Sequence, residues 1–206
     1  MTIAWLTLLG SLPAANTAPD AALRIAALKR EAPATTDYVE VRFVDLLAKP
    51  LVVRGTLALE AGGALVKRVD SPYRETTRVA DGQVTIERTG KPKRAFSLRR
   101  APELAGFLES FGALLAGDAE RLGRTYDVAV DGNEHSWHVA LTPKDAKFRR
   151  HLRSVEVVGR DDAARCFIVD EEGGDASVLL VDALAARPLP EPLARAALEA
   201  RCREAP

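Results

Sequence analysis

The sequence predicts an α+β protein that is mostly β, with a single antiparallel sheet and helices on one side of it. Three observations lead to this prediction. Apolar and polar residues alternate along most of the chain, short turns separate the alternating runs, and one helical segment interrupts them midway. The chain has 206 residues, 47% of them hydrophobic, which is enough for one domain with a full core.

The N-terminal apolar run, residues 3–12, is too short to cross a bilayer, which takes about 20 apolar residues. Its length matches the apolar region of a secretory signal peptide, and Pro13 and the small residues Ala15 and Ala18 follow it. We therefore expect residues 1–18 to be a signal peptide and residues 19–206 to form one domain. The alternative is an apolar helix that packs on the domain.

The first structured part is predicted to be a short helix and a series of hairpins. Residues 20–30 have helical spacing, with Asp20 as a candidate N-cap. From Asp37 the period of the apolar residues becomes two, which is typical of strands. The dipeptide Asp81-Gly82 fits a tight turn, because these residues accept positive φ. The predicted strands are residues 38–43, 51–60, 65–69, 73–80, 84–88 and 95–98.

A helical segment over residues 101–117 interrupts the strands, and residues 118–122 are expected to add one turn. Its apolar residues recur at the spacing of one helix face, and they include Leu104, Phe107, Leu108, Phe111 and Leu114. Gly106 and Gly112 each destabilise the helix by about 1 kcal/mol relative to Ala. A marginal helix of this kind suits a movable cover over a pocket; the alternative is an ordinary core helix.

The strands then resume, and the chain ends in a helical tail that begins near residue 184. The predicted strands are residues 126–130, 136–141, 155–158, 165–169 and 178–181, with helices at 144–152 and 192–203. The basic residues of 144–153 are expected to form a solvated helix face, or else to contact anionic head groups. Residues 170–175 read as a charged hairpin turn.

No catalytic or metal-binding pattern is present, so we expect no enzyme, no cofactor, no catalytic residue and no metal. The sequence contains no G-x-S-x-G, Gly-rich phosphate loop or H-E-x-x-H. His135 and His138 are three residues apart, which on a strand sends them to opposite faces. The net charge is zero and aromatics are 5%, which argues against nucleic-acid binding. Whether Cys166 and Cys202 pair is left open; Cys166 is expected to be buried.

Several short motifs, in order, resemble the LolA family of periplasmic lipoprotein carriers. They begin with Lys49-Pro50-Leu51, Gly55-Thr56-Leu57, the apolar strand 65–69 and Ser71-Pro72, and continue with the strand 79–84 and its Asp-Gly turn. Later come Leu-Leu-Ala-Gly at 114–117 and residues 137–141 followed by Thr142-Pro143. The match covers residues 20–183. It is closest to a LolA-like branch linked to the export of glycolipids or aryl-polyene lipids.

The resemblance implies an incomplete antiparallel β-barrel, a strongly curved sheet, closed by a helical lid. It implies a monomeric periplasmic carrier that holds the acyl chains of a lipid or lipoprotein in an apolar cavity. The carrier would take cargo from an inner-membrane exporter and pass it to an outer-membrane acceptor, without a cofactor. The arginine that latches the lid in founding members has no match here, Lys67 or Arg68 being the nearest substitutes. This departure and the tail after residue 184 favour a different lipid cargo.

We expect the inward faces of the strands and of the lid to contact the acyl chains, although each residue could equally belong to an ordinary core. The expected lid residues are Leu104, Phe107, Leu108, Phe111 and Leu114. The expected cavity residues are Val39, Val41, Phe43, Leu51, Val53, Leu57, Leu59, Val69, Val84, Ile86, Phe96, Tyr126, Val128, Trp137 and Val139. Two other classes stay open: a periplasmic lipid-sensing or interaction module on the same half-barrel, and a small esterase.

Overall fold

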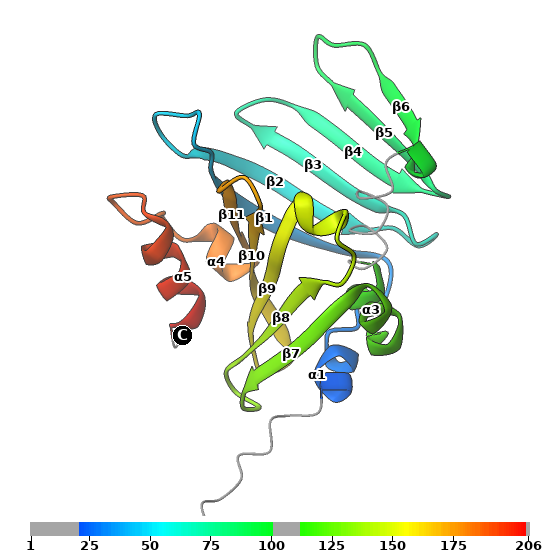
Figure 1. Ribbon diagram of the computed structural model, residues 1–206. Coiled ribbons are helices and arrows are strands. Elements are labelled where there is room, and N and C mark those ends of the chain that lie inside the picture. Colours follow the sequence, from blue (N-terminus) through cyan, green and yellow to red (C-terminus); the bar gives the residue numbers. More distant parts are fainter. Residues whose placement is uncertain (1–20, 101–111, 205–206) are drawn as a thin grey trace, which may run out of the picture.

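The computed structural model describes residues 21–100 and 112–204, and in these ranges the chain forms one antiparallel sheet of eleven strands (Figure 1). The strands follow the order β6-β5-β4-β3-β2-β1-β11-β10-β9-β8-β7. The first six are β1 (Ala34–Phe43), β2 (Leu51–Leu59), β3 (Leu65–Ser71), β4 (Glu75–Ala80), β5 (Gln83–Arg88) and β6 (Arg94–Ser97). The others are β7 (Tyr126–Gly132), β8 (Trp137–Pro143), β9 (Leu152–Arg160), β10 (Ala163–Glu171) and β11 (Ala176–Val181).

The sheet is strongly curved and does not close. Strands β6 and β7 form its two edges and do not pair with each other. Figure 1 shows two wings, β2 to β6 and β7 to β10, that bend toward each other around β1 and β11. Because β1 pairs with both β2 and β11, the first and last strands of the chain join the wings. This architecture confirms the predicted incomplete antiparallel β-barrel.

Helices cover both faces of the sheet, whereas the sequence predicted helices on one face only. On the concave face, α1 (Ala21–Ala27) and α3 (Ala119–Thr125) lie over β7 and β8, and Ile25 and Leu122 pack with Trp137 and Val157. On the convex face lie the short α4 (Ala183–Ala186) and α5 (Arg195–Arg203). The outer face of β1 and its neighbours is apolar, so it needs this second cover.

The helix predicted at residues 144–152 is wrong. The Asp145 carboxylate accepts hydrogen bonds from the backbone N–H groups of Lys147 (2.8 Å) and Phe148 (2.9 Å), which favours a tight turn over a longer helix. The chain forms only a 3-10 turn, η2 (Phe148–Arg150), and β9 begins at Leu152. A second 3-10 turn, η1 (Leu98–Arg100), follows β6.

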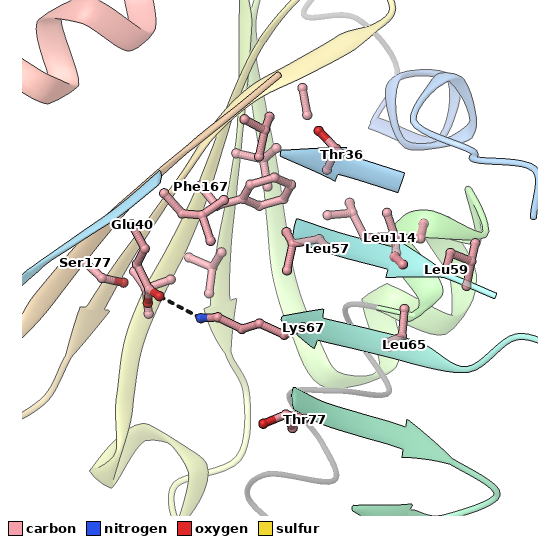
Figure 2. A pocket seen from close by; sticks show the side chains of 18 of the residues that line it. Thr36, Glu40, Leu57, Leu59, Leu65, Lys67, Thr77, Leu114, Phe167 and Ser177 are labelled. Atoms are coloured by element: carbon pink, nitrogen blue, oxygen red, sulfur yellow. Dashed lines mark hydrogen bonds and ion pairs between the residues drawn. The ribbon is translucent and has the colours of Figure 1, made fainter. Parts of the chain in front are cut away.

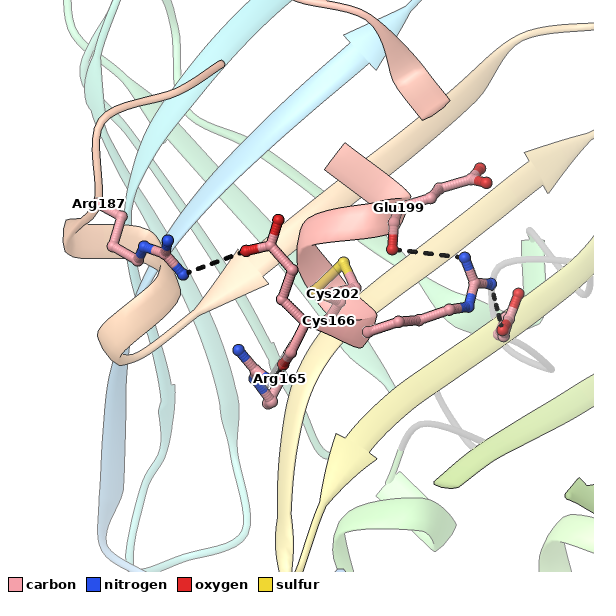
Figure 3. The surroundings of a disulfide bond; sticks show 8 residues. Arg165, Cys166, Arg187, Glu199 and Cys202 are labelled. Atoms are coloured by element: carbon pink, nitrogen blue, oxygen red, sulfur yellow. Dashed lines mark hydrogen bonds and ion pairs between the residues drawn. A yellow bond between two sulfur atoms is a disulfide. The ribbon is translucent and has the colours of Figure 1, made fainter. Parts of the chain in front are cut away.

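A disulfide fastens α5 to the outer face of β10, which answers the open question about the two cysteines. Cys166 and Cys202 are bonded, with a Cα–Cα distance of 5.8 Å (Figure 3). Arg195 at the start of α5 adds an ion pair to Asp170 of β10 at 2.6 Å. The hydrogen bonds that Arg195 donates to the Asp170 carboxylate raise the pKa of Arg195 above its usual range. The C-terminal helix is therefore anchored to the sheet at both of its ends.

Candidate functional site

The concave face holds a cavity of about 710 Å³ between the two wings (Figure 2). Strands β1 to β4 provide one wall and β7 to β11 provide the other, and Leu28 and residues 114–115 also line the space. This volume is within the range of about 300–1,000 Å³ that is usual for ligand sites. The curvature of the sheet creates the space, because it holds the two walls apart.

The walls are mainly aliphatic. The pairing of the strands aligns Leu57 with Lys67, Leu59 with Leu65, and Phe167 with Leu179 across neighbouring strands. Directly opposed residues in an antiparallel pair lie on the same face, so these side chains form rows across the concave wall that are apolar apart from Lys67. The apolar residues that line the cavity include Leu28, Leu57, Leu59, Leu65, Val79, Leu114, Leu115, Tyr126, Leu141, Val155, Val157, Phe167, Val169, Leu179 and Val181.

A cluster of three charged side chains interrupts this apolar wall: Glu40 and Arg42 of β1 and Lys67 of β3. The Glu40 carboxylate accepts hydrogen bonds from Arg42 Nε (2.9 Å) and Nη2 (3.0 Å) and from Lys67 Nζ (2.6 Å). Figure 2 shows the Lys67 side chain pointing toward Glu40. Burial favours the neutral acid, but the two cations outweigh it, and they hold the pKa of Glu40 below its usual range. Glu40 is therefore ionised at neutral pH.

Tyr38 lies beside this cluster, on the same face of β1. Its hydroxyl is buried, and in the described part of the chain it has no hydrogen-bond partner. The ammonium nitrogen of Lys67 lies 5.0 Å from the centre of the Tyr38 ring, a geometry that favours a cation–π interaction. Burial, followed by the nearby charge of Glu40, raises the pKa of Tyr38 above its usual range, so the phenol stays neutral.

The predicted cavity residues fall into three groups, of which the third, on β1, faces away from the cavity. Leu57, Leu59 and Tyr126 line the cavity, as does Leu114 of the predicted lid. A second group faces the same side of the sheet but packs into the core or lies beyond the cavity wall: Leu51, Val53, Val69, Val84, Ile86, Phe96, Val128, Trp137 and Val139. Lid residues Leu104, Phe107, Leu108 and Phe111 lie outside the described residues. Contact of these cavity and lid residues with lipid stays a prediction.

For β1 the predicted face is wrong. Val39, Val41 and Phe43 point away from the cavity and pack with Ile168, Val178, Leu180, Leu184 and Leu198 on the convex side. Both faces of β1 are covered, and the apolar set lies under the C-terminal helices. The alternate residues, Glu40 and Arg42, therefore face the cavity. A shift of one residue exchanges the whole set of side chains between the faces.

The sequence reasoning missed the charged cluster and most of the second wall. The sequence predicts Lys67 only as a substitute for the lid latch, and the predicted inward set of Val39, Val41 and Phe43 implies that Glu40 and Arg42 face outward. The signal for β1 was its strict alternation, which fixes two sets of residues but not which set faces inward. In the second wall, Phe167 and Leu179 belong to strands whose two faces are both apolar, so their sequence does not identify the inner one.

The described residues show neither a metal site nor a membrane-spanning helix. Within residues 21–100 and 112–204, no group of three or more His, Cys, Asp or Glu side chains is arranged to hold a metal ion. No helix in those ranges is long and apolar enough to cross a bilayer.

Comparison with solved structures finds distant likenesses. A LolA superfamily protein from Nitrosomonas europaea is 10% identical, with 85% of this chain and 96% of that chain covered and a TM-score of 0.42. LprF from Mycobacterium bovis is 12% identical, with 84% and 97% covered and a TM-score of 0.37. MucB, in the Pseudomonas aeruginosa MucA/MucB complex, is 18% identical, with 86% and 62% covered and a TM-score of 0.37.

Comparison of the sequence itself gives two results. A search of curated proteins finds no relative that matches it. The family model described as "Outer membrane lipoprotein carrier protein LolA-like" matches residues 13–205, a range that includes every described strand. The chain therefore belongs to the LolA-like family of outer membrane lipoprotein carrier proteins.

Proposed function

We propose that this protein is a carrier that shields the acyl chains of a lipid or lipidated protein in the cavity of its curved sheet. The observation that supports this proposal is the cavity of about 710 Å³, whose walls are mainly aliphatic. Burial of each methylene contributes about 0.8 kcal/mol, so part of one chain provides several kcal/mol. That is enough for capture, and it leaves release possible.

The proposal places the protein in the periplasm, as a monomer that receives cargo from an inner-membrane exporter and delivers it toward the outer membrane. Family membership supports this placement, as does the apolar N-terminal run of the sequence, typical of a signal peptide. We further propose that transport involves no covalent step and that the protein is not an enzyme. Reversible burial of apolar surface accounts for both loading and unloading.

A mutation that fills the cavity tests the proposal. Thr77 of β4 lines the cavity, whereas its neighbour Thr76 opposes Arg68 on the other face of the sheet. The variant Thr77→Trp places an indole in the space that an acyl chain would use, and Thr76→Trp adds the same group outside. We expect Thr77→Trp to weaken binding of the neutral fluorescent reporter N-phenyl-1-naphthylamine about tenfold or more, with less than a twofold change for Thr76→Trp.

The natural cargo is tested by purification of the protein from the periplasm, lipid extraction and mass spectrometry. A carrier should yield close to one lipid per chain, and the Thr77→Trp variant should yield much less. Absence of lipid from both proteins, together with failure of the wild-type protein to bind the reporter, would overturn the proposal. That result would favour an interaction module built on the same half-barrel.

A further inference from the structure

The apolar wall of the cavity carries two cations around a single anion. Glu40 lies on β1 opposite Val53 and Leu179, and Lys67 lies on β3 opposite Leu57. The Glu40 side chain is 9% exposed, Lys67 is 29% exposed and Arg42 is 37% exposed. The anion is thus the most buried member, and both cations are more exposed than it is.

The cluster has a net positive charge, because one carboxylate balances only one of the two cations. An ammonium group has three N–H donors and a guanidinium group has five. The structure gives Lys67 one hydrogen bond to Glu40, and gives Arg42 one from Nε and one from Nη2 to the same carboxylate. Both cations therefore keep donor capacity beyond that carboxylate, and both are partly exposed.

The other charged residues that line the cavity are more open to solvent than Glu40. Arg30, Glu171 and Asp182 are exposed, and Asp175 is half-buried. The Asp175 carboxylate already accepts a hydrogen bond from the backbone N–H of Asp45 at 3.1 Å. Water and salt screen exposed charges over about 10 Å. The enclosed cluster therefore sets the electrostatic preference of the apolar space.

We infer that the cavity recognises cargo by an anionic group, a carboxylate or a phosphate next to the acyl chain, which binds to Lys67 and Arg42. Hydrogen bonds from cations to such oxyanions are strong and directional. The chain itself would then lie along Leu57 and Phe167, which line the same space. This inference rests on the proposed function and names the chemical class of its cargo.

Displacement of the neutral reporter separates charge recognition from acyl burial. The competitors are two pairs with matched chains: palmitate with methyl palmitate, and palmitoyl lysophosphatidic acid with monopalmitoylglycerol. We expect the wild-type protein to prefer at least one anion over its neutral partner about tenfold, the size of one charged hydrogen bond. A preference for the phosphate pair alone identifies a phosphate group, and a preference for the palmitate pair alone identifies a carboxylate.

Two substitutions in the cluster should change this preference in opposite directions. Lys67→Met removes a cation and leaves Glu40 paired with Arg42, so the preference should fall to about twofold or less. Glu40→Gln removes the competing anion, so the preference should rise severalfold. Arg68→Met is the matched control, because Arg68 is the next residue and is exposed on the outer face; it should leave the preference unchanged.

A cluster that only seats Glu40 in the fold would give a different result. Its variants would lower the free energy of unfolding without altering the ratio of anionic to neutral affinities. Equal affinities for all matched pairs in the wild-type protein would overturn the inference and leave the carrier function intact, as would a preference unchanged by Lys67→Met. Failure of all four competitors and of the reporter to bind would instead overturn the proposed function.

Discussion

The two faces of the sheet use the same strands for different purposes. On the convex face, Val41, Val178 and Leu180 are fully buried under α4 and α5, and a disulfide fixes the helix in place. On the concave face, Leu179 borders an open cavity. Burial on the outside, together with the core under α1 and α3, therefore provides the stability that lets part of the inner wall stay unfilled.

Truncation of adjacent leucines on β11 gives the largest expected contrast between the faces. Leu180 is 0% exposed in the outer core, so Leu180→Ala should lower the free energy of unfolding by about 4 kcal/mol, within the range for buried leucines. Leu179→Ala only widens an existing cavity, and we expect a loss of about 1 kcal/mol. Urea denaturation measures both values, and equal losses would contradict the division between a filled and an open face.

Removal of the disulfide should have the next largest effect, again confined to the outer face. The double variant Cys166→Ala/Cys202→Ala opens a loop with a sequence separation of 36 residues, and the expected loss is about 3 kcal/mol. Reporter affinity should change less than twofold, because the bond lies across the sheet from the cavity. A reducing agent should reproduce the loss in the wild-type protein and leave the variant unchanged. A large loss of reporter affinity at temperatures where the variant stays folded would show that the faces are coupled.

The sequence predicted most strands, because half-buried strands alternate and turns such as Asp81-Gly82 separate them. It did not predict which face of β1 lines the cavity. That choice depends on α4, which packs on β1 from the far end of the chain, and on α5, which packs on the neighbouring β11. The pairing of Cys166 with Cys202 depends on the same docking. Local patterns cannot encode a contact made by a distant helix.

The charged cluster escaped prediction for a related reason. Alternation usually sends polar residues of a strand to water, and by that rule Glu40 and Arg42 belong outside. Here the outer face is covered by a helix and the inner face borders a cavity, so the charged set turns inward and pairs with Lys67. Charged residues that face inward on a strand such as β1 do not serve packing, so they indicate a functional site.

The smallest expected effect is the pH dependence that Glu40 gives to the inner wall. Arg42 and Lys67 hold its pKa below the usual range in the folded protein, so the folded state binds a proton less readily than the unfolded chain does. The resulting stability is present above the ordinary pKa of glutamate, about 4.3, and is lost as the pH falls through the folded-state pKa. Glu40→Gln should cost about 1 kcal/mol at neutral pH, and the difference from wild type should shrink below about pH 4. Urea titrations between neutral pH and pH 3 measure that difference. If the stability of wild type and of Glu40→Gln changed in parallel with pH, the two cations would not stabilise the Glu40 carboxylate. The charged cluster would then not distinguish the concave face from the convex one.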